Sequence, residues 1–146
     1  MTLTAPPPAA YGEKSRRRRM VPPIAVAGGL AAATVALHLR DPHSQGSWGI
    51  CPTAAIGFWC PGCGGLRAVN DLSNLEVGAA ASSNLLFVLS LPFIAYAFAR
   101  WANGRWTGRP WSPTDRTLNA GAIVLGVLML VFTVVRNTPA GAWLAP

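Results

Sequence analysis

The stretch AAASSNLLFVLSLPFIAYAFA, residues 79–99, decides the fold of this chain, because none of its 21 side chains carries a charge. A helix of that length is about 30 Å long at about 1.5 Å per residue, which matches the hydrocarbon thickness of a bilayer. Pro92 predicts a kink near the middle, since its ring removes one backbone hydrogen bond of the helix. We therefore predict a membrane-spanning helix here.

Two further runs, on either side of this stretch, have the same character. Residues 21–39 and 118–135 contain no Asp, Glu, Lys or Arg. Of the 146 residues in the chain, 51% are hydrophobic and only 12% are charged, which is typical of a membrane protein rather than a soluble domain. The sequence predicts an all-α membrane protein with three transmembrane helices, at about 21–39, 79–99 and 118–135. A cleaved signal peptide is the alternative for the first run, because a basic segment precedes it.

The predicted domain organisation follows from these runs. Residues 1–20 are proline-rich and then basic, so we expect a disordered cytoplasmic tail. Residues 21–139 are expected to form a single helical membrane domain, and residues 140–146 a short tail. Nine of the twelve lysines and arginines lie before the first run or between the second and third runs. The positive-inside rule therefore predicts a multi-pass protein with a cytoplasmic N-terminus and an extracytoplasmic segment between the first two helices.

The segment between the first two runs has the composition of neither a helix nor an ordinary loop. Residues 42–66 are rich in Gly and Pro and contain no Asp, Glu, Lys or Arg. Such a backbone can lie at membrane depth only where protein covers its amides, so we expect it to fold onto the outer end of the helices. Beyond it, Leu66, Val69, Leu72 and Leu75 recur every three residues and predict a short interfacial amphipathic helix at about 65–77.

All three cysteines lie in this outer segment, in the sequence CPTAAIGFWCPGCGG of residues 51–65. Two cysteines separated by two residues at the start of a helix can exchange disulfides, because the helix N-terminus favours the thiolate of the first. In this interpretation Cys60 is the nucleophile, Cys63 is its resolving partner and Cys51 is a relay. The odd number of cysteines excludes a complete set of internal disulfides.

A metal site is the alternative interpretation of the same cysteines. A turn with glycines can aim two thiolates at one ion, and zinc or iron would suit thiolate ligands. Structural zinc takes four protein ligands, which here would be Cys51, Cys60, Cys63 and a histidine, His43 or His38. A third interpretation is a purely structural turn, which needs no cofactor and catalyses no reaction.

Two polar residues near the membrane boundary are further candidates. Arg67 lies one helical turn before Asp71, and it is either half of a surface ion pair or a contact for a lipid phosphate or an acidic ligand. Asn84 lies inside the second run. We expect it to donate a hydrogen bond to another helix, because an unpaired amide in lipid is costly.

These motifs resemble a family of small bacterial membrane proteins that share a domain of unknown function. The family pattern is a Cys-Pro pair, a Gly, then Cys-Pro-Gly-Cys-Gly, Thr-Arg-Ala, and an Asn-Pro-Leu that opens the next membrane helix. The matches here are Cys51-Pro52, Gly57, residues 60–64, Arg67-Ala68 and Asn84, whereas Leu66 and Leu85 replace the expected threonine and proline. The resemblance implies a helical protein of the bacterial cytoplasmic membrane with a shared cysteine turn, and it implies no activity.

Three functions remain as hypotheses. Small residues recur four apart at Ala25, Gly29 and Ala33, and at Ala122 and Gly126, which would let helices approach closely. We expect a structural or interaction component of a membrane assembly, in contact with the lipid bilayer and with another membrane protein or a second copy. A thiol-disulfide oxidoreductase or relay and a metal-binding membrane protein are the alternatives, so the sequence leaves enzymatic activity open. The net charge of +7 does not indicate nucleic-acid binding, because the basic residues flank apolar runs.

Overall fold

The computed structural model describes residues 13–44, 51–109 and 111–145, and within these ranges it contains helices and no strand. The three long helices are α1 (Glu13–Leu39), α4 (Val77–Thr107) and α5 (Asp115–Arg136). The short elements are α2 (Pro52–Ala55), α3 (Gly65–Ser73) and the 3₁₀ helix η1 (Pro139–Leu144).

The three long helices have the length and composition of membrane spans. The qualifying stretches are Arg16–Leu39, Val77–Thr107 and Asp115–Arg136, and each overlaps one of the runs predicted from the sequence. The all-α membrane fold with three spanning helices is therefore confirmed.

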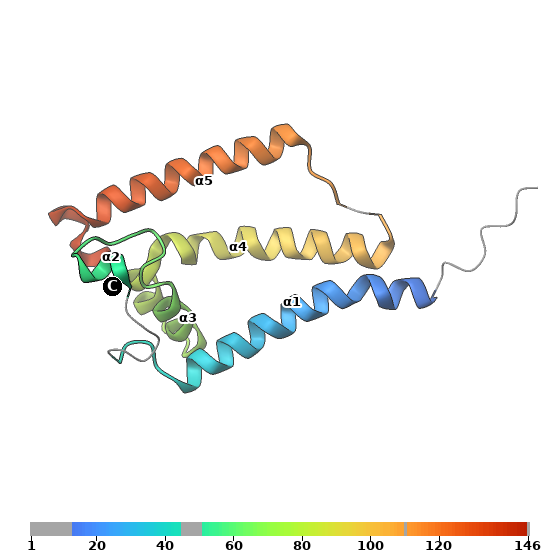
Figure 1. Cartoon of the computed structure of the whole chain (residues 1–146), viewed down its shortest axis with the longest axis horizontal. Coiled ribbons are helices and arrows are strands. Elements are labelled where there is room, and N and C mark those ends of the chain that lie inside the picture. The colour runs from blue at the N-terminus through green and yellow to red at the C-terminus, as the bar shows by residue number, and fades with distance from the viewer. Residues whose placement is uncertain (1–12, 45–50, 110, 146) are drawn as a thin grey trace, which may run out of the picture.

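The long helices lie side by side, with α4 between α1 and α5 (Figure 1). The short elements gather at one end of this bundle, where α3 contacts both α1 and α4, and η1 contacts α4 and α5. We call this the cysteine end, formed by the last turn of α1, α2, α3, the first turns of α4, and η1. The opposite end is formed by the start of α1, the end of α4 and the segment leading to α5, and we call it the arginine end.

Helix α1 begins earlier than the sequence indicated. Residues 13–20, which we expected to be part of a disordered tail, are helical, and Pro22 and Pro23 lie inside the helix rather than at its start. Arginine is a good helix former, so the basic segment extends the membrane helix outward instead of ending it. Residues 1–12 of the predicted tail lie outside the described residues.

The irregularity in α4 lies at Asn84 rather than at Pro92. Asn84 has the extended backbone angles φ −159° and ψ 90°, and it divides α4 into two helical parts. Its side-chain oxygen accepts a hydrogen bond from the backbone N–H of Phe87 at 2.9 Å, as an N-cap residue does three positions before its partner. The second part of α4 therefore starts with its own cap, and the backbone angles leave the helical region at Asn84, not at Pro92 where we predicted a kink.

The interfacial helix α3 ends at Ser73, four residues before the predicted end. Leu75 has a φ of 65°, in the left-handed region that a continuing helix does not use. The backbone N–H of Glu76 closes the turn by donating to the carbonyl of Asp71 at 2.9 Å. This tight turn leads the chain directly from α3 into α4.

Burial is concentrated at the cysteine end of the molecule. The buried side chains there include Leu37, Ala68, Ala80 and Leu144, whereas the apolar stretch of α5 is exposed almost throughout. A Cβ added to Gly29 or Gly126 would meet nothing within 4 Å, so neither glycine brings two helices into close contact among the described residues. The long helices therefore expose apolar surface along most of their length and pack closely at the cysteine end.

Candidate functional site

The cysteine loop, residues 51–64, doubles back on itself so that its first cysteine meets its last two. Pro52 begins the single turn of α2, and the N–H of Phe58 returns to the carbonyl of Thr53 at 2.9 Å. Gly57 and Gly64 have φ values of 77° and 78°, which favour glycine because its missing Cβ removes the steric penalty. Gly64 is the residue directly before α3, so its left-handed conformation leads the chain into that helix.

The three thiols form one compact group at the cysteine end. The Sγ atoms of Cys60 and Cys63 are 2.9 Å apart, and those of Cys51 and Cys63 are 3.5 Å apart. All three Sγ atoms lie within 4.8 Å of one another, which is close enough for a single metal ion to bind them. The Oγ1 atom of Thr53 lies beside them, 3.2 Å from the sulfur of Cys51 and 3.6 Å from that of Cys63.

The local environment gives the three thiols different pKa values. Hydrogen bonds from the Thr53 hydroxyl and the Ala54 N–H lower the pKa of the exposed Cys51 to about 7. The hydrogen bond from Cys63 lowers the pKa of Cys60 from its ordinary value. Burial raises the pKa of Cys63 to about 11, because the thiolate form loses water there. The group thus combines one acidic, accessible thiol with one buried thiol that holds its proton.

Arg136, at the last position of α5, binds the cysteine loop to the end of this helix. Its Nη1 donates to the carbonyl oxygens of Cys60 at 3.0 Å and Cys63 at 3.1 Å, and its Nη2 donates to that of Leu144 at 2.8 Å. The side chain is 1% exposed, and its guanidinium carbon lies 4.8 Å from the ring centre of Phe132. The sequence contains no signal for this role, because a lone arginine after an apolar run indicates only the orientation of the helix in the membrane.

Asn84 and Asn137 complete the support of the loop. The Nδ2 of Asn84, which is 2% exposed, donates to the carbonyls of Pro61 at 2.9 Å and Cys63 at 3.1 Å. Asn137 accepts from the N–H of Trp59 at 2.9 Å and donates to its carbonyl at 2.8 Å. Asn84 therefore bonds to the cysteine loop, where the sequence had suggested a partner on another helix.

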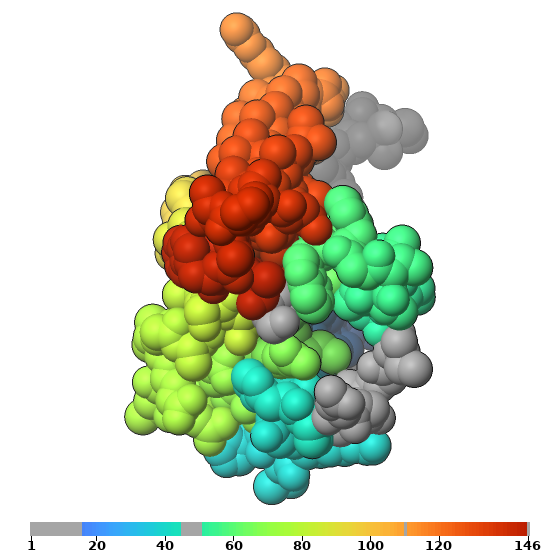
Figure 2. Space-filling view, turned by 90° about the vertical axis from the view of Figure 1, so that its left-hand side faces the viewer, coloured from blue at the N-terminus to red at the C-terminus, as the bar shows by residue number. Residues whose placement is uncertain are grey.

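Figure 2 looks onto the cysteine end and shows how these segments converge. The C-terminal residues (red) lie beside the cysteine loop (green) and the first part of α4 (yellow-green), and the end of α1 (cyan) lies below these segments in this view. Segments that are far apart in the sequence thus meet around the thiol group.

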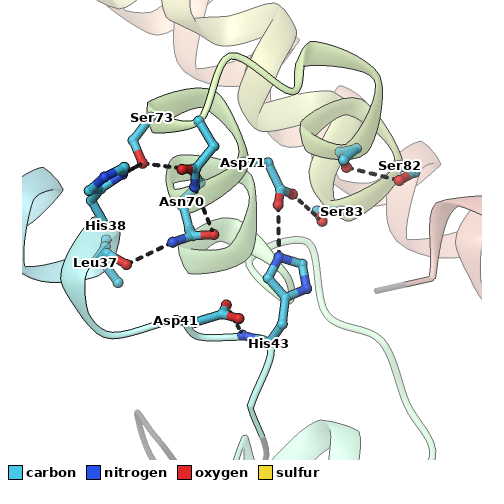
Figure 3. A network of polar contacts seen from close by, with 11 residues as sticks. Leu37, His38, Asp41, His43, Asn70, Asp71, Ser73, Ser82 and Ser83 are labelled. Carbon is cyan, nitrogen blue, oxygen red and sulfur yellow. Dashed lines mark hydrogen bonds and ion pairs between the residues drawn. The ribbon is translucent and has the colours of Figure 1, made fainter.

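A second polar cluster ties α3 to the end of α1 and the start of α4 (Figure 3). Asp71, 3% exposed, lies between the Nε2 of His43 at 2.7 Å and the hydroxyl of Ser83 at 2.8 Å. Asn70 donates to the carbonyl of Leu37 at 2.8 Å. These bonds fix the position of α3, and with it the helix that follows the cysteine turn.

The remaining candidates from the sequence lie apart from the thiols. His43 contacts Asp71, and the group of possible metal ligands found in the described residues contains the three cysteines without a histidine. His38 contacts the hydroxyl of Ser73 at 3.0 Å. Arg67 is partly exposed on α3, and Asp71 is paired with His43 rather than with Arg67.

Comparison with known proteins finds a family model that matches part of the chain. Residues 51–98 match the family model described as Protein of unknown function (DUF2752), and this segment carries the whole cysteine loop, α3 and most of α4. The predicted resemblance to a family of unknown function is confirmed over these residues. No curated protein and no solved structure matches the chain. The chain is thus a small membrane protein of undetermined function with its three thiols inside the family segment.

Proposed function

We propose that the thiolates of Cys51, Cys60 and Cys63 bind one soft divalent ion, of which zinc is the best fit, and that the bound ion fastens the cysteine loop to the helix ends. The single observation that carries this proposal is the approach of all three Sγ atoms to within 4.8 Å of one another. Cys51 lies 12 positions before Cys63, so the fold of the loop, and not the spacing of the cysteines alone, brings the three sulfurs together.

The geometry needs little adjustment to hold an ion. At a Zn–S distance of about 2.3 Å, tetrahedral ligation separates sulfurs by about 3.8 Å. The Cys51 and Cys63 sulfurs are 3.5 Å apart, and the Cys60 and Cys63 sulfurs, 2.9 Å apart, would move outward by roughly an ångström on binding. Three protein ligands leave the fourth position for water or another small ligand, which is the ligand count of zinc sites that bind exogenous molecules.

Arg136 supplies the charge that such a centre requires. Three thiolates and one divalent cation carry a net charge of −1, and a buried anion needs a nearby cation. The guanidinium of Arg136 bonds to the carbonyls of Cys60 and Cys63, and no described Asp or Glu forms an ion pair with it. The metal-loaded centre and Arg136 together would therefore be neutral.

Cobalt substitution tests this proposal on the purified full-length protein in detergent. Co²⁺ bound by three thiolates gives an intense sulfur-to-cobalt charge-transfer absorption, and we expect it to saturate at about one equivalent per chain. Replacing any one cysteine by serine should weaken cobalt binding at least about tenfold, since one thiolate ligand is lost. Absence of the charge-transfer band in the wild-type protein would end the proposal.

His43→Gln is the matched control in the same titration. If the ligand set consists of the three cysteines, this variant keeps the stoichiometry and the spectrum of the wild-type protein. If His43 is instead a fourth ligand, the visible bands of cobalt shift and the affinity falls. The two ligand sets considered from the sequence are thus distinguished by one spectrum.

A specific contact pattern also favours a second candidate function, thiol-disulfide exchange. Cys63 lies within 3.5 Å of both other sulfurs, so it could form a disulfide with either one. The Cys51 thiolate would attack the disulfide of a partner protein and release one partner thiolate. Cys63, after losing its proton, would then attack Cys51 and release the second, which leaves a Cys51–Cys63 disulfide and a reduced partner.

Mass-shift alkylation separates this second candidate from the metal site. The protein is incubated with an oxidised dithiol compound and then alkylated in denaturant, and each disulfide appears as two unmodified cysteines. Conversion of a Cys51–Cys63 pair that reverses with reductant supports exchange. Thiols that stay reduced and protected by bound metal exclude it.

The proposed location places the cysteine end on the extracytoplasmic face of a bacterial cytoplasmic membrane. The arginines at the opposite end support this orientation, because positively charged segments are retained in the cytoplasm. After a chelator has removed bound metal, alkylation of intact cells with a membrane-impermeant maleimide should label Cys51, the most exposed of the three thiols. Labelling only after the cells are opened would reverse the orientation.

A further inference from the structure

The arginine end contains a cavity that neither the thiol group nor its supporting contacts explain. Its volume is about 830 Å³, and it lies between the start of α1, the end of α4 and the segment leading to α5. Four arginines line it together with polar and tryptophan side chains, and none of its lining residues in the described part of the chain is an Asp or a Glu. The arginines are Arg16, Arg19, Arg100 and Arg109.

Two glycines allow the chain to build this cavity. A Cβ on the buried Gly104 would lie 2.8 Å from the carbonyl oxygen of Arg109 and 3.0 Å from the N–H of Trp111, so glycine lets the chain after α4 fold back against the helix. Gly108, with a φ of 76°, ends α4 in the left-handed conformation. A Cβ there would lie 2.7 Å from Nη1 of Arg19. The glycines thus bring arginines of α1 and of the α4–α5 segment to one space.

The positive charge around this cavity is not compensated within the described part of the chain. Arg16 lies over the ring of Trp106, with 4.9 Å from its guanidinium carbon to the ring centre. The Nε of Arg19 is buried and has no hydrogen-bond partner among the described residues. Several cations around one space repel one another, and one anion in the cavity would relieve this cost.

We propose that this cavity binds the phosphate of an anionic phospholipid headgroup. Guanidinium groups match phosphate oxygens with paired N–H donors, and several arginines can share one phosphate. The cavity lies at the end of three helices of spanning length, which is the depth at which headgroups lie. Trp106 and Trp111 line it, and tryptophan favours this layer of the membrane. A lipid source is therefore favoured over a soluble phosphate compound.

Native mass spectrometry of the full-length protein released from nanodiscs tests the proposal. The nanodiscs contain phosphatidylcholine alone or phosphatidylcholine with phosphatidylglycerol. We expect the wild-type protein to retain one phosphatidylglycerol molecule, and the Arg19→Gln/Arg100→Gln variant to retain it at least about tenfold less, because two charge-assisted contacts are lost. The control is Arg17→Gln/Arg18→Gln, which removes the same charge from exposed residues of α1 that do not line the cavity.

Each outcome of this experiment decides the proposal. Loss of the lipid from the cavity variant, with retention in the control, supports a specific site. Equal loss from both variants shows attraction to general surface charge and overturns it, as does equal retention in all three proteins. A thermal shift of the wild-type protein needs no variant: phosphatidylglycerol should raise its melting temperature in nanodiscs. The same rise caused by inorganic phosphate in phosphatidylcholine alone would overturn the lipid source.

Discussion

The two ends of the helical bundle solve the problem of polar groups near a membrane in opposite ways. At the cysteine end, buried Arg136 and Asn84 donate to backbone carbonyls of an irregular loop, and among the described residues only the Nε of Arg136 is a buried side-chain donor without a partner there. At the arginine end, several arginines surround a cavity of about 830 Å³, and no Asp or Glu among the described residues lines it. The first end is organised by the chain itself, and the second is organised to receive an anion.

Arg136→Gln should have the largest effect on stability, because it removes the residue that holds the cysteine loop and so tests the difference between the two ends directly. Three carbonyl oxygens lose charged donors of about 1.5 kcal/mol or more each, and we expect the free energy of unfolding to fall by about 3 kcal/mol after partial compensation by water. Denaturation in mixed micelles measures it. Arg116→Gln, at the opposite end of α5, is the control and should change stability by less than about 0.5 kcal/mol. Equal losses would contradict the assigned role of Arg136.

Alkylation rates in metal-free protein test the difference in reactivity between the exposed Cys51 and the buried Cys63. The pKa of about 7 leaves about half of Cys51 as thiolate at pH 7, whereas the pKa of about 11 leaves Cys63 almost fully protonated. After correction for the lower nucleophilicity of the more acidic thiolate, Cys51 should react about a hundredfold faster.

The pH dependence of these rates has a definite sign. As the pH rises through about 7, the rate for Cys51 reaches its plateau, while the rate for Cys63 should keep rising about tenfold per pH unit to pH 10. Peptide mapping of alkylated samples across this range measures both rates. Similar rates at pH 7 for the two cysteines would contradict the contrast between the exposed and the buried thiol.

Asn84→Ala should lower the free energy of unfolding by about 2 kcal/mol. The variant leaves the carbonyls of Pro61 and Cys63 without this donor and removes the cap of the second part of α4. Pro92→Ala is the informative control in the same helix, because α4 has regular backbone angles at that position and we expect a change below about 1 kcal/mol. A larger loss of stability in Pro92→Ala than in Asn84→Ala would contradict the assignment of the irregularity in α4 to Asn84.

Gly104→Ala is expected to have the smallest effect, and it is confined to the arginine end. The new methyl group would press against the backbone of Arg109 and Trp111 and displace it, at a cost of about 1 kcal/mol. Cobalt binding at the other end should be unchanged. A loss of cobalt affinity in this variant would show that the two ends are coupled, against the account given above.

The sequence predicted what depends on local pattern. The length of three uncharged runs defined the spanning helices, and the spacing of Cys60 and Cys63 placed two thiols together in one turn. The role of Arg136 depends on a contact across 76 positions of sequence, to the carbonyl of Cys60, and no local pattern predicts such a contact. Asn84 was recognised as a donor, but its true acceptors lie on a loop whose path is set by left-handed glycines and by long-range bonds.

The metal content of the purified protein tests the central claim most directly. Native mass spectrometry of the full-length chain, prepared without chelators, should show about one zinc ion per chain, with the accompanying loss of thiol protons. The variant in which Cys51, Cys60 and Cys63 are all replaced by serine should show none. A wild-type chain that takes up no zinc even when the ion is supplied, or a variant that binds as much as the wild-type, would contradict the claim that the three thiols form a metal centre.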